Sequence, residues 1–159
     1  MKFWLMKTEP DTFSYDDLCA GPRKTEPWDG IRNYQARNFL RDDFEVGDHV
    51  FIYHSRVKEP AIVGIAKVVK AGYPDHTALD PSSKYFDPKS AEKGESRWVM
   101  VDVQAVEKLS TPITLNDIRE NPRLSDMKVI QKGQRLSIQP VSKSEWNQVC
   151  KMANVKSKF

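Results

Sequence analysis

The sequence predicts an α+β fold, in which a curled mixed β-sheet or small barrel is surrounded by short helices. Several short segments have the alternating or Val/Ile-rich pattern of strands, and short capped helical segments lie between them. A glycine inside one of the apolar segments, Gly64, favours a bend or a close backbone approach at that point. The chain of 159 residues has the length of one domain with its own core.

The first thirty residues predict one strand, one short helix and a loop. Residues 2–6 are apolar enough to form a first strand. Ser14 is the expected N-cap of a short helix, because Asp17 stands three residues later and Gly21 follows as a stop. Residues 22–29 hold two prolines, and we expect a loop there.

The middle of the chain predicts a helix and two strands that lead into a long loop. Residues 33–41 have helical periodicity, and residues 49–54 and 61–70 have the composition of strands. Residues 73–96 contain three prolines among serines, aspartates and lysines, so a loop is expected. A loop of this length in a compact domain is more often functional or mobile than idle.

The last third predicts two more strands and two helices. Residues 98–106 alternate cleanly, with valines on one face, and residues 135–139 form a shorter apolar segment. Thr114 is the expected N-cap of a helix that runs to about Glu120. Ser142 opens the final helix with a capping box, and the apolar stripe of that helix is Trp146, Val149, Cys150 and Ala153.

Charge is distributed unevenly along the chain. The net charge is +3, and residues 128–159 contain seven Lys or Arg against one Glu, so this segment carries +6 and the first 127 residues carry −3. A basic segment on a nearly neutral body is a candidate footprint for nucleic acid. A solvated helix face followed by a lysine-rich tail explains the same charges equally well.

The chain has no sequence signal for a membrane. Its longest apolar runs are far below the roughly 20 residues that span a bilayer, and the first residues fit a strand better than a signal peptide. We therefore expect a cytoplasmic protein that does not contact a membrane, and a monomer as its oligomeric state.

Four aromatic residues are candidates for stacking on a flat ligand. Most aromatics of a domain this size belong to the core. Trp28 and Tyr34 are favoured as exposed platforms because they stand at a turn and a helix entry among polar side chains. Tyr73 and Tyr85 flank the long loop, where they are placed to close over a ligand. Three further residues fit strand or helix faces and are expected in the core: Trp4, Trp98 and Trp146.

Polar residues that suit base recognition surround these rings. Arg32, Asn33 and Gln35 supply paired donors and acceptors of the kind that read a base edge or a phosphate. Asn33 also fits the simpler role of a helix cap. Lys7 follows the first strand, at a strand end where pockets in curled sheets often open.

The His54–Ser55 pair suggests catalysis at first sight. Adjacent strand residues point to opposite faces, so the two side chains are not a nucleophile and its base. Hydrogen bonds to a ligand or to a neighbouring loop are the preferred interpretation. The chain also lacks the His and Cys spacing of a metal site. The sequence therefore predicts no catalytic residue, no metal and no cofactor.

Four residues are candidates for contact with phosphate groups. Arg135 and Ser137 place a basic group and a hydroxyl on the predicted short strand of the basic segment, and Lys132 lies just before them. Arg37 stands on the predicted helix 33–41, where it also fits a solvated helix face. Contacts of this kind hold a nucleic acid without reading its sequence.

These motifs together resemble the EVE domain family, and the resemblance covers nearly the whole chain. It is carried by WLMKTEP at 4–10, WDGIRNYQARNFL at 28–40, YHS at 53–55, AGYPD at 71–75, WVMVDV at 98–103 and QRLSIQP at 134–140. The resemblance implies a PUA-like fold, related to the YTH readers of methylated RNA, over residues 1–155, with a basic tail at 156–159. We expect the chain to begin directly at the domain, as bacterial members do.

The resemblance further implies a pocket for a modified base, methylated or hydroxymethylated cytosine being the leading candidates. The expected partner is modified DNA or RNA, and a partner effector protein is a further expectation. The expected base-binding residues are Lys7, Trp28, Arg32, Asn33, Tyr34, Gln35, His54, Ser55, Tyr73, Asp75 and Tyr85. Two alternatives are a small hydrolase that acts on nucleic acid and a binder of a free nucleoside-like molecule.

Overall fold

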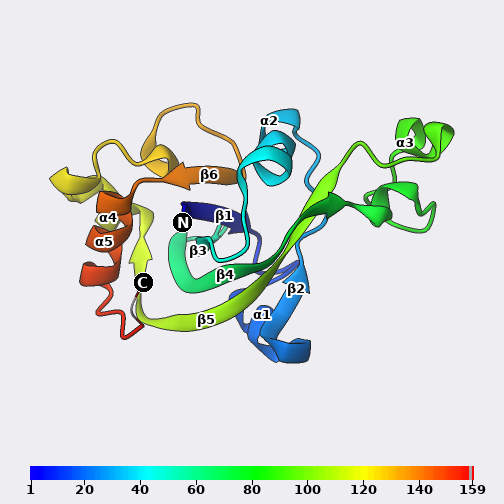
Figure 1. Cartoon of the computed structure of the whole chain (residues 1–159). Helices are drawn as coiled ribbons and strands as arrows, with labels where there is room; N and C mark the ends of the chain where they lie inside the picture. The colour runs from blue at the N-terminus through cyan, green and yellow to red at the C-terminus, as the bar shows by residue number, and fades with distance from the viewer. Residues whose placement is uncertain (158) are drawn as a thin grey trace.

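A six-stranded mixed sheet forms the centre of the computed structural model, which describes residues 1–157 and 159 (Figure 1). The strand order is β2–β5–β4–β3–β1–β6; β1 and β3 are parallel, and every other neighbouring pair is antiparallel. The strands are β1 (Phe3–Thr8), β2 (Thr25–Pro27), β3 (His49–His54), β4 (Ala61–Pro74), β5 (Val99–Thr114) and β6 (Ile138–Val141). Since β2 and β6 are edges, the described sheet is open. The predicted curled sheet is confirmed, and the closed barrel is not.

Five short α-helices surround the sheet. They are α1 (Tyr15–Ala20), α2 (Tyr34–Asn38), α3 (Pro88–Lys93), α4 (Leu115–Glu120) and α5 (Lys143–Met152). The predicted caps are confirmed, because Ser14, Thr114 and Ser142 each form a capping box with the acidic residue three positions later. The predicted helix over 33–41 is α2 followed by a wider π-turn at Phe39–Asp43.

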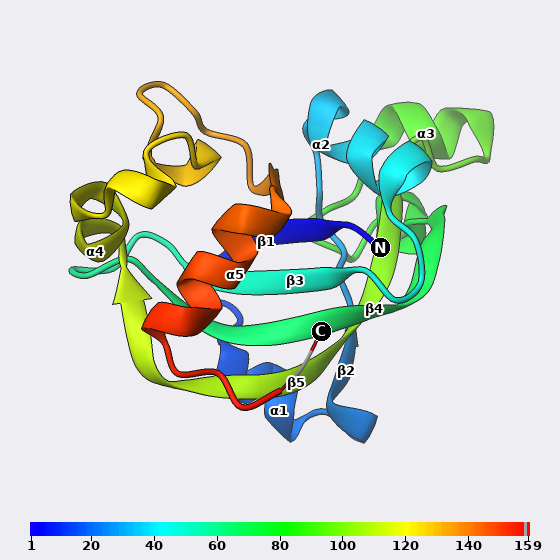
Figure 2. The same ribbon diagram turned by 60° about the vertical axis from the view of Figure 1, so that its left-hand side comes forward.

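Two apolar clusters lie on the two faces of the sheet, because successive strand residues point to opposite sides. On β1, Trp4 and Met6 join the cluster packed against α1 and α2, whereas Leu5 joins the cluster beneath α4 and α5. Figure 2 shows α5 lying across the second face. Trp4, Trp98 and Trp146 are all at most 4% exposed, so their predicted place in the core is confirmed.

The longest strands, β4 and β5, pair and curl together (Figure 1), and they contribute side chains to both clusters. Their register shifts at several points, one of them between Ile62 and Gly64. A side chain at Gly64 would collide with the ring of Tyr15, so the predicted close approach at this glycine is confirmed. Such irregularities bend and twist a long strand pair.

Four sequence-based boundaries were wrong. Residues 25–27 form β2 instead of loop; Pro27 fits because β2 is an edge strand that pairs only with β5. The predicted strand over 135–139 lies later, at Ile138–Val141, so residues 135–137 precede it as irregular backbone. The strands predicted at 61–70 and 98–106 extend to Pro74 and Thr114, because β4 and β5 pair with each other along this added length.

The segment between β4 and β5 projects from the sheet and contains α3 (Figure 1). Asp87, which is 9% exposed, ties it down by accepting hydrogen bonds from Arg97 Nε at 2.7 Å and Trp98 Nε1 at 2.8 Å. Burial opposes ionisation of this carboxyl, but these bonds and one from Ser90 hold its pKa below the usual range. The predicted long loop is therefore an anchored insertion.

The described part of the predicted tail returns to the sheet. The backbone N–H groups of Lys156 and Ser157 donate to the carboxylate of Glu107 at 2.8 and 2.7 Å. The ring of Phe159 packs edge-on against His49, with 4.5 Å between ring centroids. Lys158 lies outside the described residues. Within residues 1–157 and 159, no helix has the length and apolar character required to cross a bilayer.

Candidate functional site: a partly aromatic pocket

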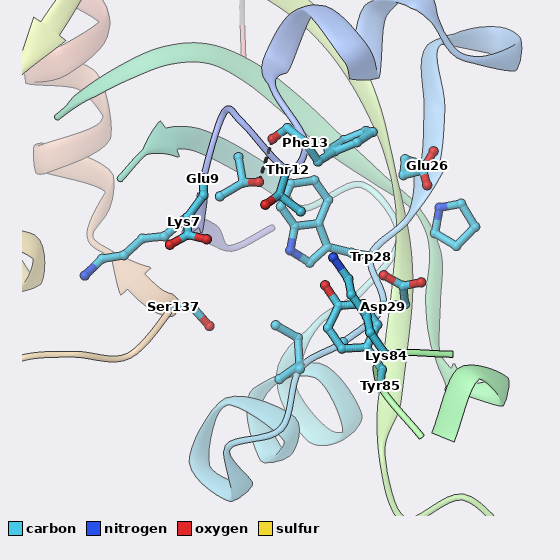
Figure 3. Close-up of a pocket in the computed structure, with 14 residues that line it drawn as sticks. Lys7, Glu9, Thr12, Phe13, Glu26, Trp28, Asp29, Lys84, Tyr85 and Ser137 are labelled. Carbon is cyan, nitrogen blue, oxygen red and sulfur yellow. Dashed lines mark hydrogen bonds between the residues drawn. The ribbon is translucent and has the colours of Figure 1, made fainter. Parts of the chain in front are cut away.

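A pocket of about 440 Å³ opens beyond the end of β1 (Figure 3). Figure 3 shows Lys7 and Glu9 on one side of it and Trp28, Lys84 and Tyr85 on the other. Four chain segments meet there: 7–13, 26–31, 84–85 and Ser137. This volume lies in the range of pockets that bind small molecules, and it is large enough for a nucleobase.

Trp28 forms part of the pocket wall and part of the core at once. It is only 8% exposed, its ring packs edge-on against Phe13 at 5.8 Å, and its backbone N–H donates to the carbonyl of Val101 at 2.7 Å. The sequence predicted an exposed platform here. The structure shows a ring held by its neighbours, with one part facing the pocket.

Tyr85 closes the pocket over Gly30. Gly30 has φ +80°, and a methyl group at this position would lie 2.5 Å from the tyrosine ring. Two donors of Arg32, Nη2 and Nε, hold the carbonyl of Tyr85 at 2.7 and 3.2 Å. The glycine thus leaves the space that the ring fills, and the arginine fixes the backbone that carries the ring.

Asp75 holds this corner of the pocket together from behind. Its carboxylate is fully buried and accepts hydrogen bonds from Arg32 Nη1 and from the N–H of Gly30, both at 3.0 Å. Thr77 donates to the same carboxylate through its N–H and its hydroxyl. Although burial opposes it, these donors lower the pKa of Asp75. The structure therefore places Arg32 and Asp75 behind the wall, where they position Gly30 and Tyr85.

Five charged residues line the cavity: Lys7, Glu9, Glu26, Asp29 and Lys84. Burial lowers the pKa of Lys7. Burial, followed by the charges of Asp29 and Asp102, raises the pKa of Glu26. Burial of its carboxyl and the charge of Asp75 raise the pKa of Asp29, although the residue as a whole is exposed. The pocket thus offers cationic donors next to two carboxyl groups, those of Glu26 and Asp29, whose pKa values are raised.

His54 and Ser55 do not line the pocket. His54 Nε2 accepts a hydrogen bond from the backbone N–H of Tyr15 at 3.0 Å, at the start of α1. Burial lowers the pKa of His54, which keeps the ring neutral and able to accept this bond. Ser55 donates its backbone N–H to the carbonyl of Thr8 at 3.0 Å. Both residues therefore join β3 to the segments beside it.

Four more predicted base-binding residues stand outside the pocket lining. Asn33 caps α2 by accepting from the N–H of Ala36 at 3.0 Å. Gln35 is exposed on the same helix. Tyr34 is 49% exposed and stacks on Trp98. Tyr73 donates its hydroxyl to Asp102 on the neighbouring strand β5.

The predicted phosphate contacts are dispersed. Ser137 lines the pocket, and its carbonyl accepts from the N–H of Lys7 at 2.8 Å. Lys132 and Arg135 are exposed on the segment that leads to Ser137. Arg37 lies on α2 and donates to the carbonyl of Arg97 at 3.0 Å. Two of these cations therefore stand on the chain segment that reaches the pocket, and one stands apart on α2.

Sequence reasoning missed several lining residues. Thr12 and Phe13 follow β1, Glu26 lies on the edge strand β2, and Lys84 precedes Tyr85 in the insertion. Only Lys84 had a detectable signal, because it is adjacent to a tyrosine already singled out. The others reach the pocket through the curl of the sheet, which local sequence does not encode.

The described residues do not bring three His, Cys, Asp or Glu side chains together as a metal site requires. The lone pair of His54 Nε2 is already used by the Tyr15 N–H. The pocket itself has paired donors and acceptors next to aromatic surface. This chemistry suits recognition of a flat polar ring.

Comparisons with known proteins agree with this fold. The EVE domain profile matches residues 2–152. Human thymocyte nuclear protein 1 is 42% identical over 161 residues, covering 91% of this chain and 70% of that protein. A solved structure from Pseudomonas syringae superimposes with TM-score 0.88 at 42% identity, covering 95% and 99% of the two chains.

One similar solved structure carries a nucleic acid. The human THYN1 protein in complex with DNA containing 5-methylcytosine is 39% identical and superimposes with TM-score 0.88 over 100% of both chains. A Zymomonas mobilis ASCH protein matches with TM-score 0.55 at 11% identity, which reflects the fold alone. The solved relatives are of the PUA-like fold, as the sequence predicted.

Proposed function

This chain belongs to the EVE domain family, and we propose that it is a non-enzymatic reader that binds a modified nucleobase, such as methylated or hydroxymethylated cytosine, in DNA or RNA. The observation that carries the proposal is the pocket between Trp28 and Tyr85, in a chain similar along its whole length to a protein solved with 5-methylcytosine DNA. The same proposal includes a single domain over residues 1–155, a basic tail after it and a cytoplasmic location.

The pocket has a stacking surface and an edge for the base. Trp28 and Tyr85 offer aromatic surface, and base stacking on such rings is worth about 1–3 kcal/mol. Extruding a base from a strand costs a few kcal/mol, so stacking and hydrogen bonds together can offset that cost. Lys7 and Lys84 supply donors for the oxygens of the base or its phosphate.

The carboxyl groups of Glu26 and Asp29 suit cytosine better than thymine. A carboxylate accepts a hydrogen bond from the N4 amino group of cytosine. Thymine has the same methyl group at C5 but carries an oxygen acceptor in place of that amino group. Two acceptors facing each other leave a buried polar group without a partner, which costs about 1–3 kcal/mol.

Binding measurements with matched oligonucleotides test the proposal. Single strands that differ at one position, as 5-methylcytosine, cytosine or thymine, are titrated by fluorescence anisotropy. We expect the order 5-methylcytosine, then cytosine, then thymine. Tyr85→Ala should remove most of the preference, whereas Tyr73→Ala, a half-buried tyrosine outside the pocket lining, should keep it. Equal binding of all three strands would overturn the proposal.

A chemical measurement separates a reader from an enzyme. The relatives carry no catalytic names, and His54 is engaged with the backbone of Tyr15. Incubation with the same oligonucleotides, followed by mass spectrometry of the nucleosides, should recover every base unchanged. Turnover that His54→Ala abolishes would replace the reader with a hydrolase. Equally tight binding of the free nucleoside would favour a small-molecule binder.

A further inference from the structure

We propose that Tyr34, together with Arg37, is a second nucleotide platform outside the pocket, which stacks an unpaired base within three positions of the modified base on the same strand. The proposal rests on the proposed function, because the platform binds a base on the same strand as the modified base in the pocket. Tyr34 does not line the pocket, so the platform is a separate contact.

The ring of Tyr34 is exposed yet held in place. It is 49% exposed, and it stacks on Trp98 with 4.9 Å between ring centroids and 27° between planes. Trp98 is itself 4% exposed and anchored through its Nε1 to Asp87 at 2.8 Å. A ring fixed in this way loses little conformational entropy when a base stacks on it.

Two guanidinium groups flank the ring and differ in their charge balance. Arg37 Cζ lies 4.9 Å and Arg97 Cζ 5.7 Å from the centroid of Tyr34. Arg97 is paired with Asp87, with 2.7 Å between Nε and Oδ2. Arg37 donates to the carbonyl of Arg97 and to the amide oxygen of Asn38, both at 3.0 Å, which are neutral acceptors. Arg37 is thus positioned by neutral groups and keeps its charge available for a phosphate.

Arg32 links the platform to the pocket. Its Cζ lies 5.5 Å from the ring of Trp98 and 5.6 Å from the ring of Tyr85. Trp98 carries the stacked Tyr34, and Tyr85 is the pocket wall. The path from pocket to platform therefore consists of three contacts, each shorter than 6 Å. These contacts hold the platform and the pocket wall close together, and a single strand can reach both, since bases of one strand commonly stack on successive aromatic rings.

Fluorescence of 2-aminopurine tests the platform directly. The analogue is placed in turn at each of the three positions on either side of 5-methylcytosine in a single strand, and its quenching on binding is recorded. We expect one position to be quenched by the wild-type chain and by Tyr34→Phe, which keeps the ring. Tyr34→Ala should abolish that quenching and weaken binding by roughly 5- to 100-fold. Circular dichroism and thermal melting check that the variant is folded.

Arg37 has a matched control on the same segment. Arg41 lies four residues later and is paired with Asp42, with 2.8 Å between Nε and Oδ1. Arg37→Gln should reduce the salt dependence of binding by about one phosphate contact, whereas Arg41→Gln should leave it unchanged. Equal effects of the two variants would remove the phosphate contact from the proposal.

The outcomes separate this inference from the proposed function. If Tyr34→Ala leaves quenching and affinity unchanged while 5-methylcytosine is still preferred, the platform is wrong and the reader stands. If the wild-type chain shows no preference for 5-methylcytosine but keeps quenching that depends on Tyr34, the reader is wrong. The chain would then be a binder of single strands without preference for modification.

Discussion

Gly30 gives the sharpest test of how the pocket wall is built. In the structure a methyl group at this position would lie 2.5 Å from the Tyr85 ring, where ordinary contacts begin near 3.4 Å. Gly30→Ala must therefore displace the ring by about 1 Å, and overpacking of this kind typically costs about 1–3 kcal/mol. The positive φ of +80° adds about 1 kcal/mol of backbone strain. We expect a total loss of about 2–4 kcal/mol in the free energy of unfolding.

A double-mutant cycle separates the two contributions. In a Tyr85→Ala background the ring is absent, so Gly30→Ala should cost only the strain, about 1 kcal/mol. Gly47→Ala is the matched control for strain, because Gly47 has φ +97° and its missing side chain would meet nothing within 4 Å. Urea unfolding at equilibrium measures all four chains and the control. Equal costs of Gly30→Ala in the two backgrounds would show that Tyr85 does not rest on Gly30.

Further predictions concern charge. Burial, and then the charge of Asp75, raise the pKa of Asp29, so the ionised form of Asp29 opposes folding. Asp29→Asn should therefore raise Tm at pH 7, and this gain should disappear below pH ~4. Thermal melts across this pH range measure the effect. Hydrogen bonds from Arg97, Ser90 and Trp98 outweigh the effect of burial and lower the pKa of Asp87. Asp87→Asn should therefore reduce the free energy of unfolding, measured in urea at pH 7, by about 2–3 kcal/mol. The loss should become smaller as the pH falls below about 4. Arg135→Gln should weaken binding of modified and unmodified strands alike and reduce the salt slope by about 1; a changed preference would place Arg135 in the pocket.

Features that depend on neighbours in sequence could be predicted. The N-caps at Ser14, Thr114 and Ser142 were predicted from residues near in sequence, and each is present as a capping box with the acidic residue three positions later. The alternation in the first half of β5 predicted that Val101 and Val103 share a face, and both are buried. The close approach at Gly64 could be predicted because a glycine inside a Val/Ile-rich strand commonly marks a bulge or a near neighbour.

Features that depend on distant pairing could not be predicted. β2 contains a proline and only three residues, and its identity as a strand comes entirely from pairing with β5. The prediction of the site missed Glu26 for the same reason, because this residue reaches the pocket from β2. Trp28 was predicted to be exposed because its neighbours in sequence are polar, although its neighbours in space include Phe13. The polar sequence context therefore gave the wrong packing for this ring.

The arrangement of charges and rings sets how selective such a reader can be. A methyl group adds only on the order of 1 kcal/mol of apolar burial, about a fivefold preference. Lys132 and Arg135 lie on the exposed segment that leads to the pocket. If they contact phosphates as proposed, they contact those of modified and unmodified strands equally. Raising the salt concentration should therefore weaken the binding of both strands equally and leave the ratio of their affinities unchanged. A ratio that falls with salt would mean that the preference itself depends on a phosphate contact, and that the pocket does not read the base.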